Sequence, residues 1–88
     1  MKMKVWNFTQ SGYWFLKGSE FYANSDFENA MDSYRKAIQL DIYNVDAMLN
    51  LSAIYEMRKR YSVASKWYRI IISIDPDQLE AYYGYAIC

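Results

Sequence analysis

The residues best able to do chemistry are few in this chain and poorly placed for catalysis. The sequence contains no histidine, so the commonest general base and metal ligand is missing. Its one cysteine, Cys88, therefore has no imidazole to activate it as a nucleophile. The carboxylate pairs Asp26/Glu28 and Asp75/Asp77 lie beside predicted helix starts, where capping explains them better than a metal or acid–base site. We therefore expect no enzyme, no metal and no cofactor.

Composition points to one small folded domain. The chain has 88 residues, of which 53% are hydrophobic and 19% aromatic, including 10 tyrosines, which is too apolar for a disordered segment. Ten basic and ten acidic residues argue against a dominant nucleic-acid surface. A single cysteine forms no internal disulfide, which favours the cytoplasm or nucleus. Neither a signal peptide nor a membrane-spanning run of roughly 20 apolar residues is expected.

Apolar residues recur at helical spacing along the whole chain. Asp26 and Asn44 can cap the second and third predicted helices, and Asp77 with Glu80 approaches a capping box before the fifth. Pro76 ends the fourth helix. The pattern predicts five helices, at 12–24, 27–41, 45–58, 61–74 and 78–87. Residues 4–8 are too short to decide between strand and helix.

Seven positions of one segment return 34 residues later, a period typical of stacked helix–turn–helix repeats. The pairs are Trp14 and Met48, Gly18 and Ser52, Phe21 and Tyr55, Phe27 and Tyr61, Ala30 and Ala64, Tyr34 and Tyr68, and Ala37 and Ile71. This spacing resembles the tetratricopeptide repeat, although Lys17 and Ile42 stand where that family usually has Leu and Pro. The resemblance implies an all-α, right-handed superhelical stack of antiparallel helix pairs that binds other proteins.

The repeat register divides the chain into four parts. Residues 1–10 form an N-terminal extension, 11–44 the first repeat, 45–78 the second, and 79–88 a partial third repeat or terminal helix. Small residues at the Gly18 and Ala30 positions should let paired helices approach closely, with large residues filling the space beside them. We expect Trp14 to pack between the first two helices, close to Gly18.

In the resembled family, the first helix of each repeat lines a concave groove. Carried onto this sequence, the positions that could contact a partner are Phe15, Leu16, Ser19, Tyr22, Leu49, Asn50, Ala53, Met57, Tyr83 and Ile87. The same lining also includes the acidic residues Asp46, Glu56 and Glu80. A Lys/Asn/Arg clamp for acidic tails is not matched, because only Asn50 agrees. The expected partner is instead an amphipathic helix or an extended apolar segment of another protein.

Three alternatives to a free groove remain open at this point. Residues 1–10 could cover part of the lining. The chain could belong to a larger repeat array, or associate with a second copy, through residues 79–88, where Tyr83 and Ile87 lack cover. The basic residues from Arg58 to Arg69, with Tyr61 and Trp67 beside them, could contact RNA, although the balanced net charge disfavours it.

Overall fold

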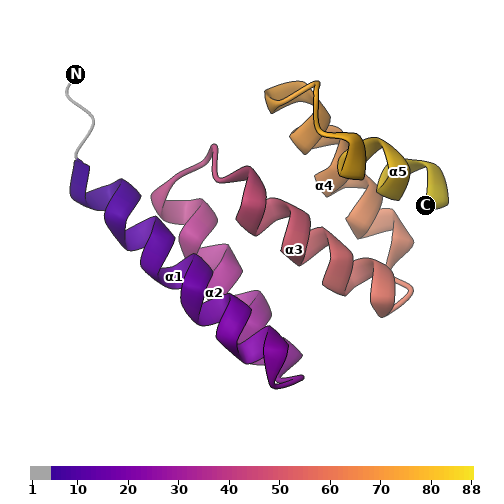
Figure 1. Ribbon diagram of the computed structural model, residues 1–88. Coiled ribbons are helices and arrows are strands. Elements are labelled where there is room, and N and C mark those ends of the chain that lie inside the picture. The colour runs from indigo at the N-terminus through magenta and orange to yellow at the C-terminus, as the bar shows by residue number, and fades with distance from the viewer. Residues whose placement is uncertain (1–4) are drawn as a thin grey trace.

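Five helices make up the part of the chain that the structure describes. The computed structural model describes residues 5–88, with side chains from residue 9 onward. The helices are α1 (Val5–Ala23), α2 (Phe27–Leu40), α3 (Val45–Met57), α4 (Tyr61–Ile74) and α5 (Leu79–Ile87), and residues 5–88 contain no strand (Figure 1). The all-α prediction is confirmed.

The first helix is longer than the sequence pattern predicted. It begins at Val5 rather than at residue 12, so residues 5–8 are helical and not a strand. Residues 5–10 continue α1 in one line instead of forming a separate segment that folds back over the lining. Residues 1–4 lie outside the described part of the chain.

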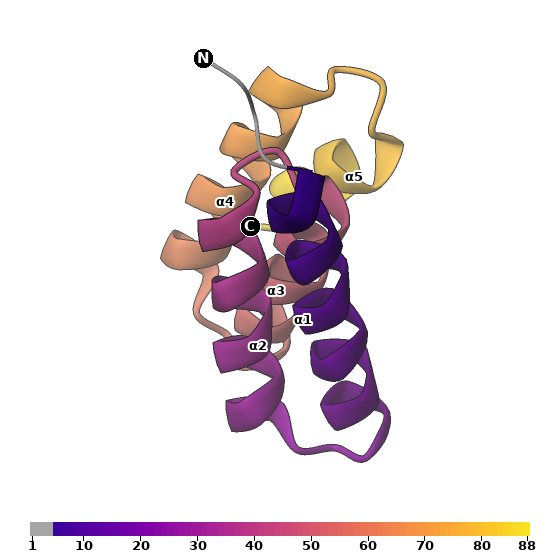
Figure 2. The ribbon, with the colours of Figure 1, turned by 90° about the vertical axis from the view of Figure 1, so that its left-hand side faces the viewer.

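The helices pack as two pairs followed by a single helix. α1 lies along α2 and α3 along α4, while α5 packs on α4 and touches α3 (Figure 1). From the side, α2 and α4 lie on one side of the stack, and α1 and α5 lie on the other (Figure 2). The stack is thin, with extents of 37 × 30 × 17 Å. Such a shape leaves much of every helix close to solvent.

Two of the three predicted caps are present. Asp26 Oδ1 accepts the Asn29 N–H at 3.4 Å, and Asn44 Oδ1 accepts the Ala47 N–H at 3.1 Å. The capping box predicted before the fifth helix is wrong. The N-cap position of α5 is Gln78, so Asp77 lies one residue too early to cap the helix. The Gln78 side chain makes no cap hydrogen bond either.

The turns inside the two pairs share one backbone conformation. Ser25 and Lys59, at equivalent repeat positions, both have φ of 61°, in the left-handed region. The next residue then donates back to the preceding helix, from Asp26 N to Phe21 O and from Arg60 N to Tyr55 O, each at 2.8 Å. Neither position is glycine, so composition gave no signal of these turns.

A tyrosine, not the tryptophan, fills the space at Gly18. A Cβ placed on Gly18 would lie 2.7 Å from the Tyr34 ring, whereas Trp14 is half-buried with the Lys36 ammonium 4.2 Å from its ring centroid. Trp14 packs against the buried cluster to which α2 contributes, as expected, but the close contact at Gly18 is made by Tyr34. Tyr34 is fully buried because glycine lets its ring reach the α1 backbone.

A second tyrosine–glycine contact lies at the other end of the stack, but it joins α4 to the following helix instead of to the helix of its own pair. The Tyr68 ring lies against Gly84 on α5, so close that a Cβ there would overlap it. Tyr68 and Tyr34 each centre a buried cluster, the first with Met48, Ala64, Ile71 and Ala81, the second with Ala30, Met31, Ala37, Ala47, Leu51 and Ile54. Each second helix thus anchors on a glycine of a first helix.

Replacing this glycine should destabilise the fold. We expect Gly18→Ala to lower the free energy of unfolding by about 1–3 kcal/mol, because the buried Tyr34 ring would have to move. Urea denaturation followed by circular dichroism measures this difference.

Gly12 provides a matched control on the same helix. A Cβ at Gly12 meets no atom within 4 Å, so Gly12→Ala should be neutral or stabilising by up to about 1 kcal/mol. Equal effects of the two substitutions would contradict the proposed Tyr34 contact.

Candidate functional site

Exposed apolar side chains gather on the first helices of the repeats. Leu16 is 66% exposed, Met57 49% and Tyr83 74%, although each is large and apolar. Ala53, Tyr22 and Ile87 are exposed as well. We call the surface of α1, α3 and α5 that carries these six residues the α1–α3–α5 face. None of the six belongs to a buried cluster.

The other four predicted contact residues are half-buried and support the core. The Phe15 ring lies 5.9 Å from the Tyr34 ring, and Leu49 packs against the cluster around Tyr68. Phe15 and Leu49, predicted as partner contacts, thus also take part in the packing of the core. A charged residue at either position would disturb packing as well as binding.

Tyr34 fixes the polar part of the face between α1 and α3. Its hydroxyl accepts a hydrogen bond from Asn50 Nδ2 at 3.1 Å and lies 3.2 Å from Ser19 Oγ. The structure thus brings Ser19 and Asn50 together on one buried hydroxyl. The family resemblance predicts both residues as groove positions, but the sequence carries no signal that Tyr34 joins them.

Tyr68 has the corresponding place between α3 and α5. Its hydroxyl donates to Glu56 Oε1 at 2.8 Å, while its ring covers Gly84. Burial, followed by the hydrogen bond to Glu56, raises the pKa of Tyr68 well above its usual range. The bond also holds the Glu56 carboxylate at the edge of the face.

The charges along the face are negative. Asp46, Glu56 and Glu80 occupy predicted contact positions on α3 and α5, and the negative charges of Glu56 and Glu80 both act on Tyr68. Among the basic residues, Arg58 pairs with Glu28 and Arg35 with Asp32, on α2 and at the end of α3. The face therefore combines apolar contact area with carboxylates.

Cys88 is not activated. Burial and, secondarily, the negative charge of Glu56 raise the pKa of its thiol. A nucleophilic cysteine needs the opposite shift, toward the thiolate. The terminal thiol thus has the environment of an ordinary side chain.

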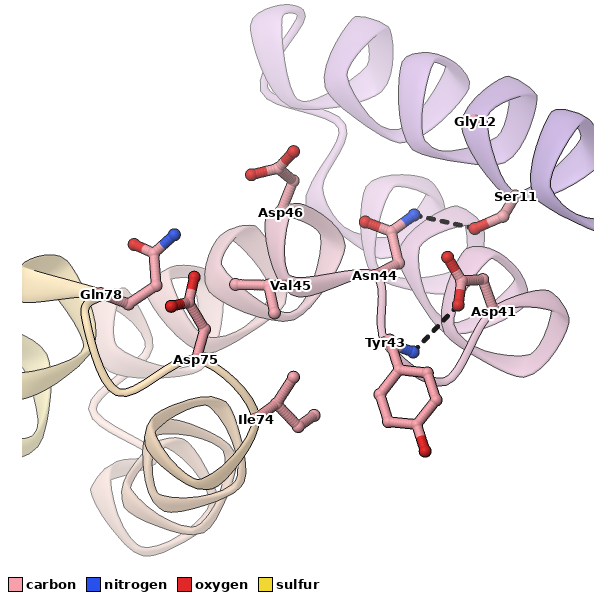
Figure 3. Close-up of a pocket in the computed structure, with 10 residues that line it drawn as sticks. All are labelled: Ser11, Gly12, Asp41, Tyr43, Asn44, Val45, Asp46, Ile74, Asp75 and Gln78. Atoms are coloured by element: carbon pink, nitrogen blue, oxygen red, sulfur yellow. Dashed lines mark hydrogen bonds between the residues drawn. The ribbon is translucent and has the colours of Figure 1, made fainter.

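None of the six exposed apolar residues of the α1–α3–α5 face lines the three clefts, although Asp46 borders the most polar one. The most polar one, of about 570 Å³, opens where the loops between repeats meet the start of α3 (Figure 3). There Asn44 Nδ2 donates to Ser11 Oγ at 2.8 Å, and Ser11 in turn donates to the Ala37 carbonyl. Asp41 accepts the Tyr43 N–H at 3.0 Å. These hydrogen bonds hold the loop between α2 and α3 against α1, so the polar side chains of the cleft serve the fold and do not require a ligand.

Metal binding finds no support in the part of the chain that the structure describes. Within residues 5–88, no three His, Cys, Asp or Glu side chains gather as a metal site would require. The other two clefts are a shallow one on α4 beside Lys66, Arg69 and Ile70, and an apolar one between α4 and α5. As for membranes, the described helices are too short or too polar to span one.

The shifted pKa of Tyr68 predicts a pH dependence. The folded chain holds this proton more tightly than the unfolded chain, so the associated stability is complete below about pH 10 and is lost as the pH rises further. Tyr68→Phe lacks the proton. We expect its stability deficit relative to the parent to shrink between about pH 8 and pH 11 in urea denaturation. A deficit that stays constant over this range would contradict the Tyr68–Glu56 interaction.

Comparison with known proteins agrees with this architecture. A family profile described as tetratricopeptide repeat matches residues 11–41. The crystal structure of MamA superimposes with a TM-score of 0.85 at 25% identity, covering 90% of this chain and 46% of that one.

Two curated relatives are much longer. The protein bimA of Emericella nidulans is 30% identical over 61 residues, which is 69% of this chain and 8% of the relative. The general transcriptional corepressor ssn6 of Schizosaccharomyces pombe is 29% identical over 63 residues, 72% of this chain and 6% of the relative. The profile match, the superposition on MamA and the internal repetition together identify this chain as a member of the tetratricopeptide-repeat family.

Proposed function

We propose that this chain is a non-catalytic adaptor that holds an amphipathic segment of a partner protein on its α1–α3–α5 face. Tetratricopeptide repeats act generally as scaffolds for protein–protein interaction. The observation that carries the proposal is the exposure of Leu16, Met57 and Tyr83, three large apolar side chains that the core does not use. An amphipathic helix or extended apolar strip would cover them and remove their surface from water.

The charge of the face indicates the kind of segment. Asp46, Glu56 and Glu80 would repel an acidic tail and attract a basic one. The partner segment should therefore carry Leu-like residues on one side and Lys or Arg at its edge. The Asn50 side-chain amide already donates a hydrogen bond to the Tyr34 hydroxyl. This bond disfavours a role for Asn50 in the clamp that binds acidic tails in some members of the family.

An RNA-binding role for residues Arg58 to Arg69 is less well supported. Arg58 is paired with Glu28, so part of the basic cluster is already neutralised within the fold. Lys66 and Arg69 flank only a shallow cleft on α4. We retain protein binding as the function.

A basic amphipathic peptide tests the proposal directly. The probe is a fluorescein-labelled 18-residue peptide with a leucine face and a lysine face, and its glutamate counterpart serves as a charge control. Binding is measured by fluorescence anisotropy. Leu16→Ser combined with Met57→Ser should weaken binding at least about tenfold, because both contact sites would be lost.

Ile70→Ser is the matched control variant. Ile70 is also a large exposed aliphatic residue, but it lies on α4, away from the face. This variant should bind the lysine peptide as the parent does. Loss of binding in Ile70→Ser, or equal binding of lysine and glutamate peptides, would overturn the assignment.

Residues 79–88 form a second candidate interface. Leu79, Tyr82, Tyr83, Tyr85 and Ile87 are all exposed on this single helix. Association through α5, with a second copy or within a larger assembly, would cover them. Light scattering at rising protein concentration tests self-association. A strictly monomeric chain at high micromolar concentration would leave only association with a different protein.

A further inference from the structure

Met57 places an exposed sulfur atom on the α1–α3–α5 face. It is the last residue of α3, its side chain is 49% exposed, and it is the one sulfur-bearing residue among the six that define the face. The other methionines whose side chains the structure describes are buried, since Met31 is 5% exposed and Met48 2%. Each belongs to a buried cluster, Met31 to that of Tyr34 and Met48 to that of Tyr68. Oxidants in solution therefore reach one of these three thioethers far more readily than the others.

The thioether of an exposed methionine reacts with hydroperoxides without first losing a proton. The sulfur lone pair attacks a peroxide oxygen, so that an S–O bond forms while the O–O bond breaks. The proton of the transferred hydroxyl passes to the departing hydroxide or alkoxide, which leaves as water or an alcohol. Sulfur is oxidised by the two electrons that the peroxide gains, and the product is methionine sulfoxide. A sulfoxide reductase that uses a dithiol reverses the step, releasing the oxygen as water and forming a disulfide in the reductant.

The single cysteine is poorly suited to the same role. A thiol reacts with hydroperoxides as the thiolate. Burial, followed by the negative charge of Glu56, raises the pKa of the Cys88 thiol above its ordinary value, which already lies above neutral pH. This sequence also holds no second cysteine that could trap an oxidised Cys88 as an internal disulfide. Among the sulfur atoms that the structure describes, that of Met57 is therefore the one whose reversible oxidation would alter the face.

Oxidation would change the chemistry of the face where a partner packs. The flexible, apolar methionine side chain adapts to irregular apolar partners, whereas the sulfoxide carries a polar oxygen that loses its hydration when it is covered. Ala53, one turn earlier on the same side of α3, offers that oxygen no hydrogen-bond donor. The adjacent Glu56 carboxylate only accepts hydrogen bonds, and it already accepts one from Tyr68. Covering an oxidised Met57 with an apolar segment would therefore leave its oxygen without a partner on this chain.

We propose that Met57 is a reversible oxidation site, and that its conversion to the sulfoxide by a hydroperoxide weakens partner binding on the α1–α3–α5 face. The inference rests on the proposed adaptor function and adds its regulation. In the reduced state the face is apolar and acidic, as binding requires. In the oxidised state a polar group stands at the end of α3, in the middle helix of the face.

Peptide mapping by mass spectrometry measures which methionine reacts. The full chain with Cys88→Ser, which removes thiol chemistry, is treated with hydrogen peroxide at neutral pH. The initial oxidation rate of Met57 should exceed those of Met31 and Met48 at least about tenfold, because the folded chain shields the two buried thioethers. Equal initial rates at the three positions would overturn the inference.

The fluorescein-labelled lysine peptide then reports on binding by anisotropy. In the Cys88→Ser chain, peroxide treatment should weaken peptide binding about five- to tenfold. Methionine sulfoxide reductases of both stereospecificities, supplied with dithiothreitol, should restore the original affinity. Met57→Gln, which carries a polar oxygen on a side chain of similar length, should bind as weakly as the oxidised chain before any treatment.

Met57→Leu is the matched control variant, because it keeps an apolar side chain that peroxide does not oxidise. Its affinity for the lysine peptide should be the same before and after treatment, although its other methionines remain. An oxidised parent that binds as tightly as the reduced one would overturn the inference, as would a peroxide effect that persists in Met57→Leu. Failure of the untreated parent to bind the peptide would overturn the adaptor proposal first, and this inference with it.

Discussion

The contact between a tyrosine and a glycine on facing helices sets the geometry of this stack. Tyr34 reaches the α1 backbone at Gly18, and Tyr68 reaches α5 at Gly84, because neither glycine has a side chain in the way. The Tyr34 hydroxyl then extends to Asn50 on α3, the next first helix, whereas the Tyr68 hydroxyl reaches Glu56 on α3, the first helix of its own pair. A buried hydroxyl that lost its partner would cost about 1–3 kcal/mol, so the contact fixes the helix spacing as well as filling space.

The surface for partners follows from this constraint. With Tyr34 and Tyr68 filling the interior, Leu16, Met57 and Tyr83 on the first helices are not needed for packing and stay exposed. The hydrogen bond from Tyr68 places the Glu56 carboxylate beside them. The same residues that hold the repeats together thus determine the apolar and acidic character of the proposed binding face.

Much of the fold could be predicted from the sequence because the repeat period and helical spacing are local patterns. The caps at Asp26 and Asn44 followed from the same patterns. The start of α1 could not, since residues 5–8 carry no helical signal that a short window distinguishes from a strand. The roles of Trp14 and Phe15 could not be predicted either. The aromatic ring that meets Gly18 is set by the way α1 and α2 cross in three dimensions. The exposure of the contact positions likewise depends on three-dimensional packing: Leu16 is 66% exposed, whereas Leu49, equally apolar, is half-buried.

Mapping of backbone amide shifts by NMR during titration with the basic amphipathic peptide tests the central claim most directly. We expect the largest shifts on α1, α3 and α5, around Leu16, Ala53, Met57 and Tyr83, with α2 and the outer side of α4 nearly unchanged. Shifts confined to α2 and α4, or centred on the basic residues from Arg58 to Arg69, would contradict it.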